Sequence, residues 1–360
     1  MNLNRSWLSR DPLIFIVIFL ISLSIRLPLV SVPNTTVLDE SLFIIFAANT
    51  ITGRPFFEPH PPLGWLSLSV VSYGLSTDKI SDFRLVNGTS QSFGGFPYTR
   101  GRTSSAIWGS LIPALIYALG RMLGLGKKGA ILPAVLAIFD GGLIIHSRIL
   151  MPDSMLIALG LMGVVTTLFA DKFQERKRYL LLILAGLFLG CAVATKWTAM
   201  AFLAVAIMAV LIRGSLLKKK IIDISVVTIS TISIYVFIFL MYFNIFYSGP
   251  VDTKFSLYKG ESVKALVFPG AGEWINNLKF IFSYNKAIFS MHASSKEVLA
   301  LKRGSDDPIL WPIFAISRNY WGPDRPYFRE IILKGNIFSW GTALVSLVII
   351  IGVALLALFR

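Results

Sequence analysis

The sequence predicts an all-α polytopic membrane protein, and three observations support this fold class. Hydrophobic residues make up 55% of the 360 residues, whereas charged residues make up only 15%. Soluble domains are about 45–50% apolar and about 25% charged, so this chain has more apolar side chains than a soluble core can bury. Apolar runs long enough to cross a bilayer recur along the chain, and clusters of lysine and arginine separate them.

The apolar runs define about eight candidate membrane spans, because about 20 apolar helical residues cross roughly 30 Å of hydrocarbon. They are Leu13–Val30, Ser104–Leu123, Gly129–His146, Ser154–Ala170, Tyr179–Ala194, Trp197–Ile212, Ile221–Tyr247 and Ile337–Phe359. The first run is longer than the apolar core of a signal peptide, and no A-x-A-like site follows it, which predicts an uncleaved span. We expect residues 1–360 to form one membrane domain.

Basic residues between the spans predict the orientation. Clusters precede the first span and follow the second, fourth and sixth: Arg5 and Arg10; Arg121, Lys127 and Lys128; Lys172, Arg176, Lys177 and Arg178; Arg213, Lys218, Lys219 and Lys220. With eight spans all four clusters share one side, which the positive-inside rule makes cytoplasmic, together with the N-terminus. Two long segments, about residues 31–102 and 248–336, then lie outside. Within the first, Ser41–Ile51 predicts a short amphipathic helix, and Leu63–Val71 is too short to span.

The net charge of +15 comes from 34 basic and 19 acidic residues. Much of the basic excess lies in short loops, where it orients a membrane protein, so we expect no nucleic-acid partner. In the long outer segments it suits phosphate or acidic lipid headgroups. The single cysteine, Cys191, lies inside an apolar run and gives no disulfide framework, and no cluster of His and Cys predicts a bound metal.

The first outer segment carries two candidate motifs. Asp39 and Glu40 follow the first span, and adjacent carboxylates at a membrane surface can supply a general base for a hydroxyl nucleophile. Asp39 as the N-cap of the following helix is an equally simple interpretation. In Glu58-Pro59-His60-Pro61-Pro62-Leu63-Gly64 the prolines restrict the backbone and hold His60 in a defined place. Rigid support suits a site, although a stiff turn with an incidental histidine explains the same pattern.

Ionisable residues recur near the outer ends of later spans. Arg102 opens the second span, Arg148 follows the third, Asp153 opens the fourth and Lys196 separates the fifth from the sixth. Such cations often only anchor helix ends, but their coincidence with the carboxylates and the histidine on one side predicts a site. Asp140 lies within an apolar run, where an ionisable group is costly and marks a functional position by default.

In their order along the chain, these residues resemble the protein O-mannosyltransferases, which are GT-C glycosyltransferases of family 39. The matching pieces are Asp39-Glu40, His60-Pro61-Pro62-Leu63-Gly64, Arg102 with Ser105-Ala106, Phe139-Asp140, Ser147-Arg148, Asp153-Ser154, Lys196-Trp197, His292, Trp311-Pro312 and Lys334-Gly335-Asn336. The resemblance covers about Val37 to Trp340, and the His-Pro-Pro-Leu-Gly block is its most specific part.

The chain also departs from the family pattern. Trp65 stands where the family usually has Lys, and Glu58 stands where it usually has Asp. The second outer segment is too short for the soluble domain that eukaryotic members insert there, so the resemblance points to a bacterial or archaeal plasma-membrane protein. Family members usually have further spans, so a chain that stops at Arg360 resembles a C-terminally truncated form.

The resemblance implies transfer of mannose or a related hexose from a polyprenyl- or dolichyl-phosphate donor to Ser/Thr hydroxyls of an acceptor protein, with inversion and without a metal or other cofactor. Asp39 is then the expected base, and Glu40 orients it or binds the acceptor. The other expected site residues are donor-binding (Arg102, Arg148, Lys196 and His60) or supporting (Glu58, Asp140, Asp153 and Trp311).

Three alternatives remain open at this point. Aminoarabinose transferases that act on lipid A share the first carboxylate loop but usually carry Lys-Pro-Pro where His60-Pro61-Pro62 stands. A secondary transporter would place its charges in mid-span, as only Asp140 is here. A non-catalytic membrane scaffold would keep donor binding without turnover. The sequence does not predict the oligomeric state.

Overall fold

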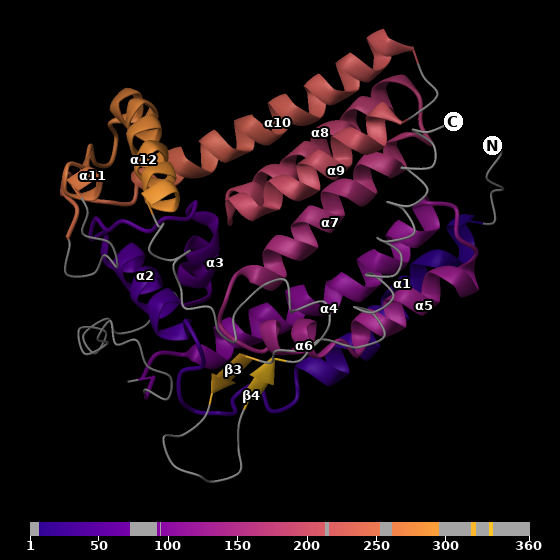
Figure 1. The fold of residues 1–360 in the computed structure, drawn as a ribbon, viewed down its shortest axis with the longest axis horizontal. Coiled ribbons are helices and arrows are strands. Elements are labelled where there is room, and N and C mark those ends of the chain that lie inside the picture. Colours follow the sequence, from indigo (N-terminus) through magenta and orange to yellow (C-terminus); the bar gives the residue numbers. More distant parts are fainter. Residues whose placement is uncertain are drawn as a thin grey trace.

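A computed structural model describes residues 7–72, 92–93, 95–212, 216–252, 261–294, 318–321 and 331–333, which are mostly helical. The helices of the bundle are α1 (Trp7–Arg26), α4 (Tyr98–Met122), α5 (Lys127–Ile138), α6 (Gly141–His146), α7 (Asp153–Ala170), α8 (Glu175–Val193), α9 (Met200–Leu211) and α10 (Leu217–Phe243). Figure 1 shows the long members side by side, with α4 packed on α1, α5 and α7, and α8 packed on α7 and α10.

Most of the predicted spans coincide with these helices. By length and composition, α4, α7 and α10 can each cross a membrane. Helices α1 and α8 have 20 and 19 residues and carry charged residues near their ends. Helix α9 has only 12 residues and follows a 3₁₀ turn at Trp197–Ala199, so it is shorter than predicted. The expected span Ile337–Phe359 lies outside the described residues.

The prediction of a continuous span over Gly129–His146 is wrong, because the chain breaks between α5 and α6. Asp140 is the N-cap of α6, and its carboxylate accepts a hydrogen bond from the Leu143 N–H at 2.9 Å. The buried guanidinium of Arg26 donates to the carbonyls of Ala137 and Ile138, each at 3.2 Å, and so satisfies the last turn of α5. A helix break therefore accounts for the charge at Asp140.

The elements of both long segments gather at one end of the bundle, opposite the end where the basic connections lie (Figure 1). They are α2 (Glu40–Thr52), α3 (Leu63–Ser72), α11 (Glu261–Lys264) and α12 (Trp274–Ser294), with the antiparallel pair β1 (Gly249–Pro250) and β2 (Val267–Phe268). A second antiparallel pair joins β3 (Arg318–Trp321) to β4 (Ile331–Leu333). The helix predicted over Ser41–Ile51 is present as α2, but it is buried on almost every side rather than amphipathic.

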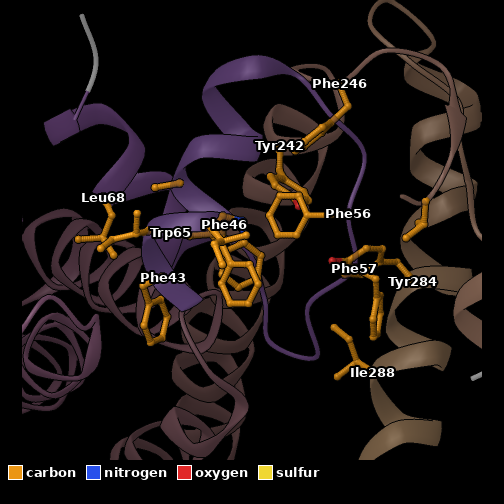
Figure 2. Packing of buried hydrophobic residues seen from close by; sticks show 14 of the residues in the cluster. Phe43, Phe46, Phe56, Phe57, Trp65, Leu68, Tyr242, Phe246, Tyr284 and Ile288 are labelled. Atoms are coloured by element: carbon orange, nitrogen blue, oxygen red, sulfur yellow. The ribbon is translucent and has the colours of Figure 1, made fainter. Parts of the chain in front are cut away.

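An aromatic core fixes α2 and α3 to α10 and α12 (Figure 2). The rings of Phe46 and Phe56 stack with centroids 5.4 Å apart, and Phe56 meets the edge of Tyr242. Such pairs contribute about 0.5–1.5 kcal/mol each beyond the burial of their area. Trp65 is 1% exposed and lies against Phe46, Phe56 and Tyr242. The tryptophan that departs from the family pattern is therefore a core residue.

Candidate active site

A buried ion pair links the first outer segment to α4. The Nε and Nη2 atoms of Arg102 each donate to one carboxylate oxygen of Glu40 at 2.7 Å. The same carboxylate accepts from the backbone N–H groups of Val37 at 2.8 Å and Leu150 at 2.6 Å. Glu40 and Arg102 are 0% and 1% exposed. The pair therefore ties α2 to α4 and to the connection between α6 and α7.

The remaining donors of Arg102 go to the backbone. They reach the carbonyls of Val30 at 3.3 Å, Pro33 at 2.7 Å and Thr35 at 3.1 Å, so all five guanidinium N–H groups have acceptors. With no donor left over, Arg102 does not fit the phosphate-binding role expected from the sequence, and the saturated carboxylate of Glu40 does not fit acceptor binding. These contacts favour a positioning role for both residues, and the expected donor-binding role of Arg102 stays a prediction.

Asp39 lies beside this pair and is exposed. It occupies the N-cap position of α2, but its side chain makes no capping hydrogen bond, so capping does not explain the aspartate. Leu38, immediately before it, has φ of 48°, a left-handed conformation that is unfavourable for leucine. Such residues cost on the order of 1–3 kcal/mol and persist where the surroundings fix them. Glu40 provides that constraint because it is hydrogen-bonded to Val37 N–H and to Arg102. The backbone held in this way leaves the side chain of Asp39 exposed on the protein surface.

The Pro-rich block carries a second carboxylate. His60 Nδ1 lies 2.6 Å from Glu58 Oε1, while Glu58 is 4% exposed. Burial is the largest influence on the Glu58 carboxyl and raises its pKa, and the negative charge of Asp39 acts in the same direction. The hydrogen bond and charge of His60, and the charge of Lys196, lower this pKa. Asp39, His60 and Lys196 therefore each lie within electrostatic reach of Glu58.

Helix α12 holds the block from one side. The Tyr284 hydroxyl donates to the Glu58 carbonyl at 3.3 Å and accepts from the Glu58 N–H at 3.3 Å. His292 Nε2 lies 3.0 Å from the Pro59 carbonyl, and the His292 ring meets that of His60 edge-on at 5.9 Å. His292 was expected from the family resemblance. Tyr284 was not, although the 3.6-residue spacing of its apolar neighbours could have indicated a buried helical face.

The bundle holds the block from the other side. Leu63 N–H donates to the Ala194 carbonyl at 2.8 Å, which joins the start of α3 to the end of α8. A Cβ on Gly64 would lie 3.0 Å from the ring of Pro152. Any residue other than glycine at this position would therefore require the proline ring to move. The backbone around His60 is thus confined on both sides, as its prolines predicted.

The other expected cations are less constrained than Arg102. Lys196 Nζ lies 2.8 Å from Asp153 Oδ1, with side chains 17% and 25% exposed. This pair joins the turn before α9 to the start of α7. Arg148 donates from Nη2 to the Pro28 carbonyl at 2.7 Å, and its pKa is lowered by burial and by the nearby charge of Arg102. Trp311 lies outside the described residues.

The shifted pKa of Glu58 gives a prediction about stability. The pKa of Glu58 in the folded protein lies above the ordinary value of 4.5, so the folded state holds the proton more tightly than the unfolded state does. The protonated carboxyl therefore contributes its full share to the unfolding free energy below pH 4.5, and this share is lost as pH rises through the folded pKa. Glu58→Gln cannot titrate. We expect the wild type to lose unfolding free energy relative to this variant from pH 4.5 upward. Denaturant unfolding of both proteins in detergent across this range measures the difference, and a difference independent of pH would contradict the shift.

The fold and this group of residues are those of an integral membrane protein with a polar cluster at one end of a helical bundle. The sequence model of one family, described as dolichyl-phosphate-mannose-protein mannosyltransferase, matches residues 16–249, which is more than half of the chain. The chain therefore belongs to this family, as the resemblance predicted.

Individual relatives agree with this assignment. The chain is 26% identical over 189 residues to dolichyl-phosphate-mannose–protein mannosyltransferase 4 of Candida albicans, covering 50% of this chain and 24% of that one. It is 25% identical over 201 residues to the enzyme of the same name in Schizosaccharomyces pombe, covering 55% and 26%. The solved Pmt1-Pmt2 complex of Saccharomyces cerevisiae, bound to the sugar donor, matches with a TM-score of 0.58 at 22% identity, over 66% of this chain and 34% of that one. The chain thus spans about a quarter of the length of the curated relatives that it matches.

Proposed function

We propose that the protein transfers mannose, or a related hexose, from a polyprenyl- or dolichyl-phosphate carrier to Ser/Thr hydroxyls of proteins. The observation that carries the proposal is the exposed carboxylate of Asp39, which lies beside a saturated buried ion pair and within electrostatic reach of Glu58, as His60 and Lys196 also do. Membership of the mannosyltransferase family supports the same reaction.

The chemistry assigns different tasks to these groups. The acceptor oxygen attacks the anomeric carbon, the bond from that carbon to the phosphate oxygen breaks, and the phosphate leaves with the bonding electrons. Asp39 accepts the hydroxyl proton on the face opposite the leaving group, which gives inversion. Negative charge grows on the departing phosphate, so a cation there stabilises the transition state more than the ground state. Lys196 and Arg148 suit this task better than Arg102, whose donors are all used.

The supporting residues follow from their contacts. Glu40 and Arg102 position Asp39, and Glu58 orients His60 toward sugar or phosphate. Because Asp140 caps α6, no mid-span charge remains among the expected site residues to favour a transporter. We further propose that the site is extracytoplasmic, in a bacterial or archaeal plasma membrane, with the basic connections and the N-terminus cytoplasmic.

The test is a transfer assay with the whole chain in nanodiscs. Polyprenyl-phosphate mannose and a Ser/Thr-rich peptide are supplied, and mass spectrometry follows the mannosylated peptide, with the same peptide carrying Ala at each Ser and Thr as the control. We expect a product with inverted anomeric configuration, formed equally with and without a metal chelator. Transfer only from a polyprenyl-phosphate aminoarabinose donor, or donor binding without any transfer, would overturn the proposal.

A further inference from the structure

Helix α12 has one apolar face that the protein buries. Its buried side chains recur at helical spacing and include Phe280, Ile281, Tyr284, Ala287 and Ile288. They pack into the aromatic core against α10 (Figure 2). This face also supplies the Tyr284 contact with Glu58. The burial of this face explains why the helix forms. It accounts for only some of the apolar residues of α12.

A second apolar face of α12 is left exposed. Ile275 is 73% exposed, Leu278 46%, Phe282 78% and Phe289 66%. At about 100° per residue these four side chains fall within about 60° of one another, so they form one stripe along the helix. Large aromatic side chains exposed to this extent and in one contiguous stripe mark an interaction surface.

Two lysines border the stripe. Lys279 and Lys286 are exposed and lie seven residues apart, which places them about 20–40° from Ile275, on the side away from Leu278. Within the described part of the chain, neither lysine takes part in an ion pair. Ser283 and Ser290 follow further round. The exposed surface thus changes from apolar to cationic to polar over about 140° of the helix circumference.

The placement of α12 suits a membrane surface. Figure 1 shows the helix at the end of the bundle, where it runs across the direction of α10 rather than along it. If α10 crosses the bilayer, a helix in this position lies close to the plane of one leaflet. A helix with exposed aromatic residues beside basic ones is typical of interfacial helices, in which the apolar side enters the acyl boundary and the lysines meet the phosphates.

We propose that α12 is an interfacial helix that docks on an anionic phospholipid leaflet, with Phe282 and Phe289 among the acyl chains and Lys279 and Lys286 on the headgroup phosphates. Its inner face holds Glu58 through Tyr284 and Pro59 through His292. Docking would therefore set the depth of the site relative to the leaflet, and this consequence alone rests on the proposed function.

The depth of single labels tests the docking without any turnover. Cys191 is the only cysteine, so Cys191→Ser provides a background into which Phe282→Cys and Phe289→Cys are introduced, with Ser283→Cys and Ser290→Cys as matched controls on the same helix. Nitroxide-labelled proteins in nanodiscs of phosphatidylglycerol and phosphatidylcholine are compared by power saturation. We expect the two phenylalanine positions to be accessible to oxygen and protected from a water-soluble nickel chelate, and the two serine positions to show the reverse.

The lysines are tested in the same system. For the label at position 282, we expect the depth to increase from pure phosphatidylcholine to discs containing phosphatidylglycerol, and this increase to be lost with Lys279→Gln and Lys286→Gln combined. Equal nickel access at all four labelled positions would overturn the proposal. Protection from both oxygen and nickel at the phenylalanine positions would also overturn it, because a protein would then cover the stripe. Inactivity in the transfer assay would leave these results unaffected.

Discussion

Replacing Arg102 with methionine is expected to destabilise the protein by about 3–5 kcal/mol, because it leaves the Glu40 carboxylate buried without its cation. The carboxylate is 0% exposed and cannot recover water. Three backbone carbonyls, those of Val30, Pro33 and Thr35, lose their donor at the same time. The measurement is denaturant unfolding of the purified chain in detergent, followed by circular dichroism.

A double variant separates this role from phosphate binding. Glu40→Gln combined with Arg102→Met removes the uncompensated charge, so we expect it to be less destabilised than the sum of the two single variants. If Arg102 instead bound the donor phosphate, Arg102→Met would unfold like the wild type and bind polyprenyl-phosphate mannose more weakly. That pattern would restore the role that the sequence suggested.

The helices that hydropathy predicted correctly needed only local information. A run of apolar residues crosses lipid as a helix whatever its neighbours are, since the backbone must bond within itself. The break at Asp140 could not be predicted in this way, because it depends on Arg26, more than a hundred residues earlier in the chain. The guanidinium of Arg26 donates to the last carbonyls of α5, which the break leaves without helical partners. Because the sequence does not show the contact with Arg26, a carboxylate in an apolar run is interpreted as a functional group rather than as a helix cap.

For the candidate site, the sequence indicated which residues lie close together but not what each of them contacts. The prolines around His60 predicted a confined backbone, and in the structure this backbone lies between α12 and Pro152. The adjacent carboxylates were harder to separate, because neighbouring residues point about 100° apart at the start of a helix and the sequence does not tell which direction is inward. In the structure Glu40 turns to Arg102 and Asp39 turns outward. Only tertiary contacts determine this difference.

Asp39→Asn is expected to lower the rate of transfer by about 10²–10⁴-fold, which is the usual contribution of a positioned general base. Asparagine has nearly the same shape, and the Glu40–Arg102 pair does not involve the changed side chain. We therefore expect the unfolding free energy and the affinity for polyprenyl-phosphate mannose to stay near those of the wild type. The measurement is the initial rate of peptide mannosylation at saturating donor in nanodiscs.

Glu175→Gln is the matched control for Asp39→Asn, since it makes the same chemical change at an exposed carboxylate at the start of α8, the opposite end of that helix from Lys196. It is expected to transfer mannose at the wild-type rate. Equal activity of Asp39→Asn and wild type would remove Asp39 as the base and leave Glu58 as the carboxylate nearest to His60. Weakened donor binding in Asp39→Asn would instead assign Asp39 to the sugar, because a base that acts only on the acceptor hydroxyl contributes nothing to the ground-state affinity for the donor.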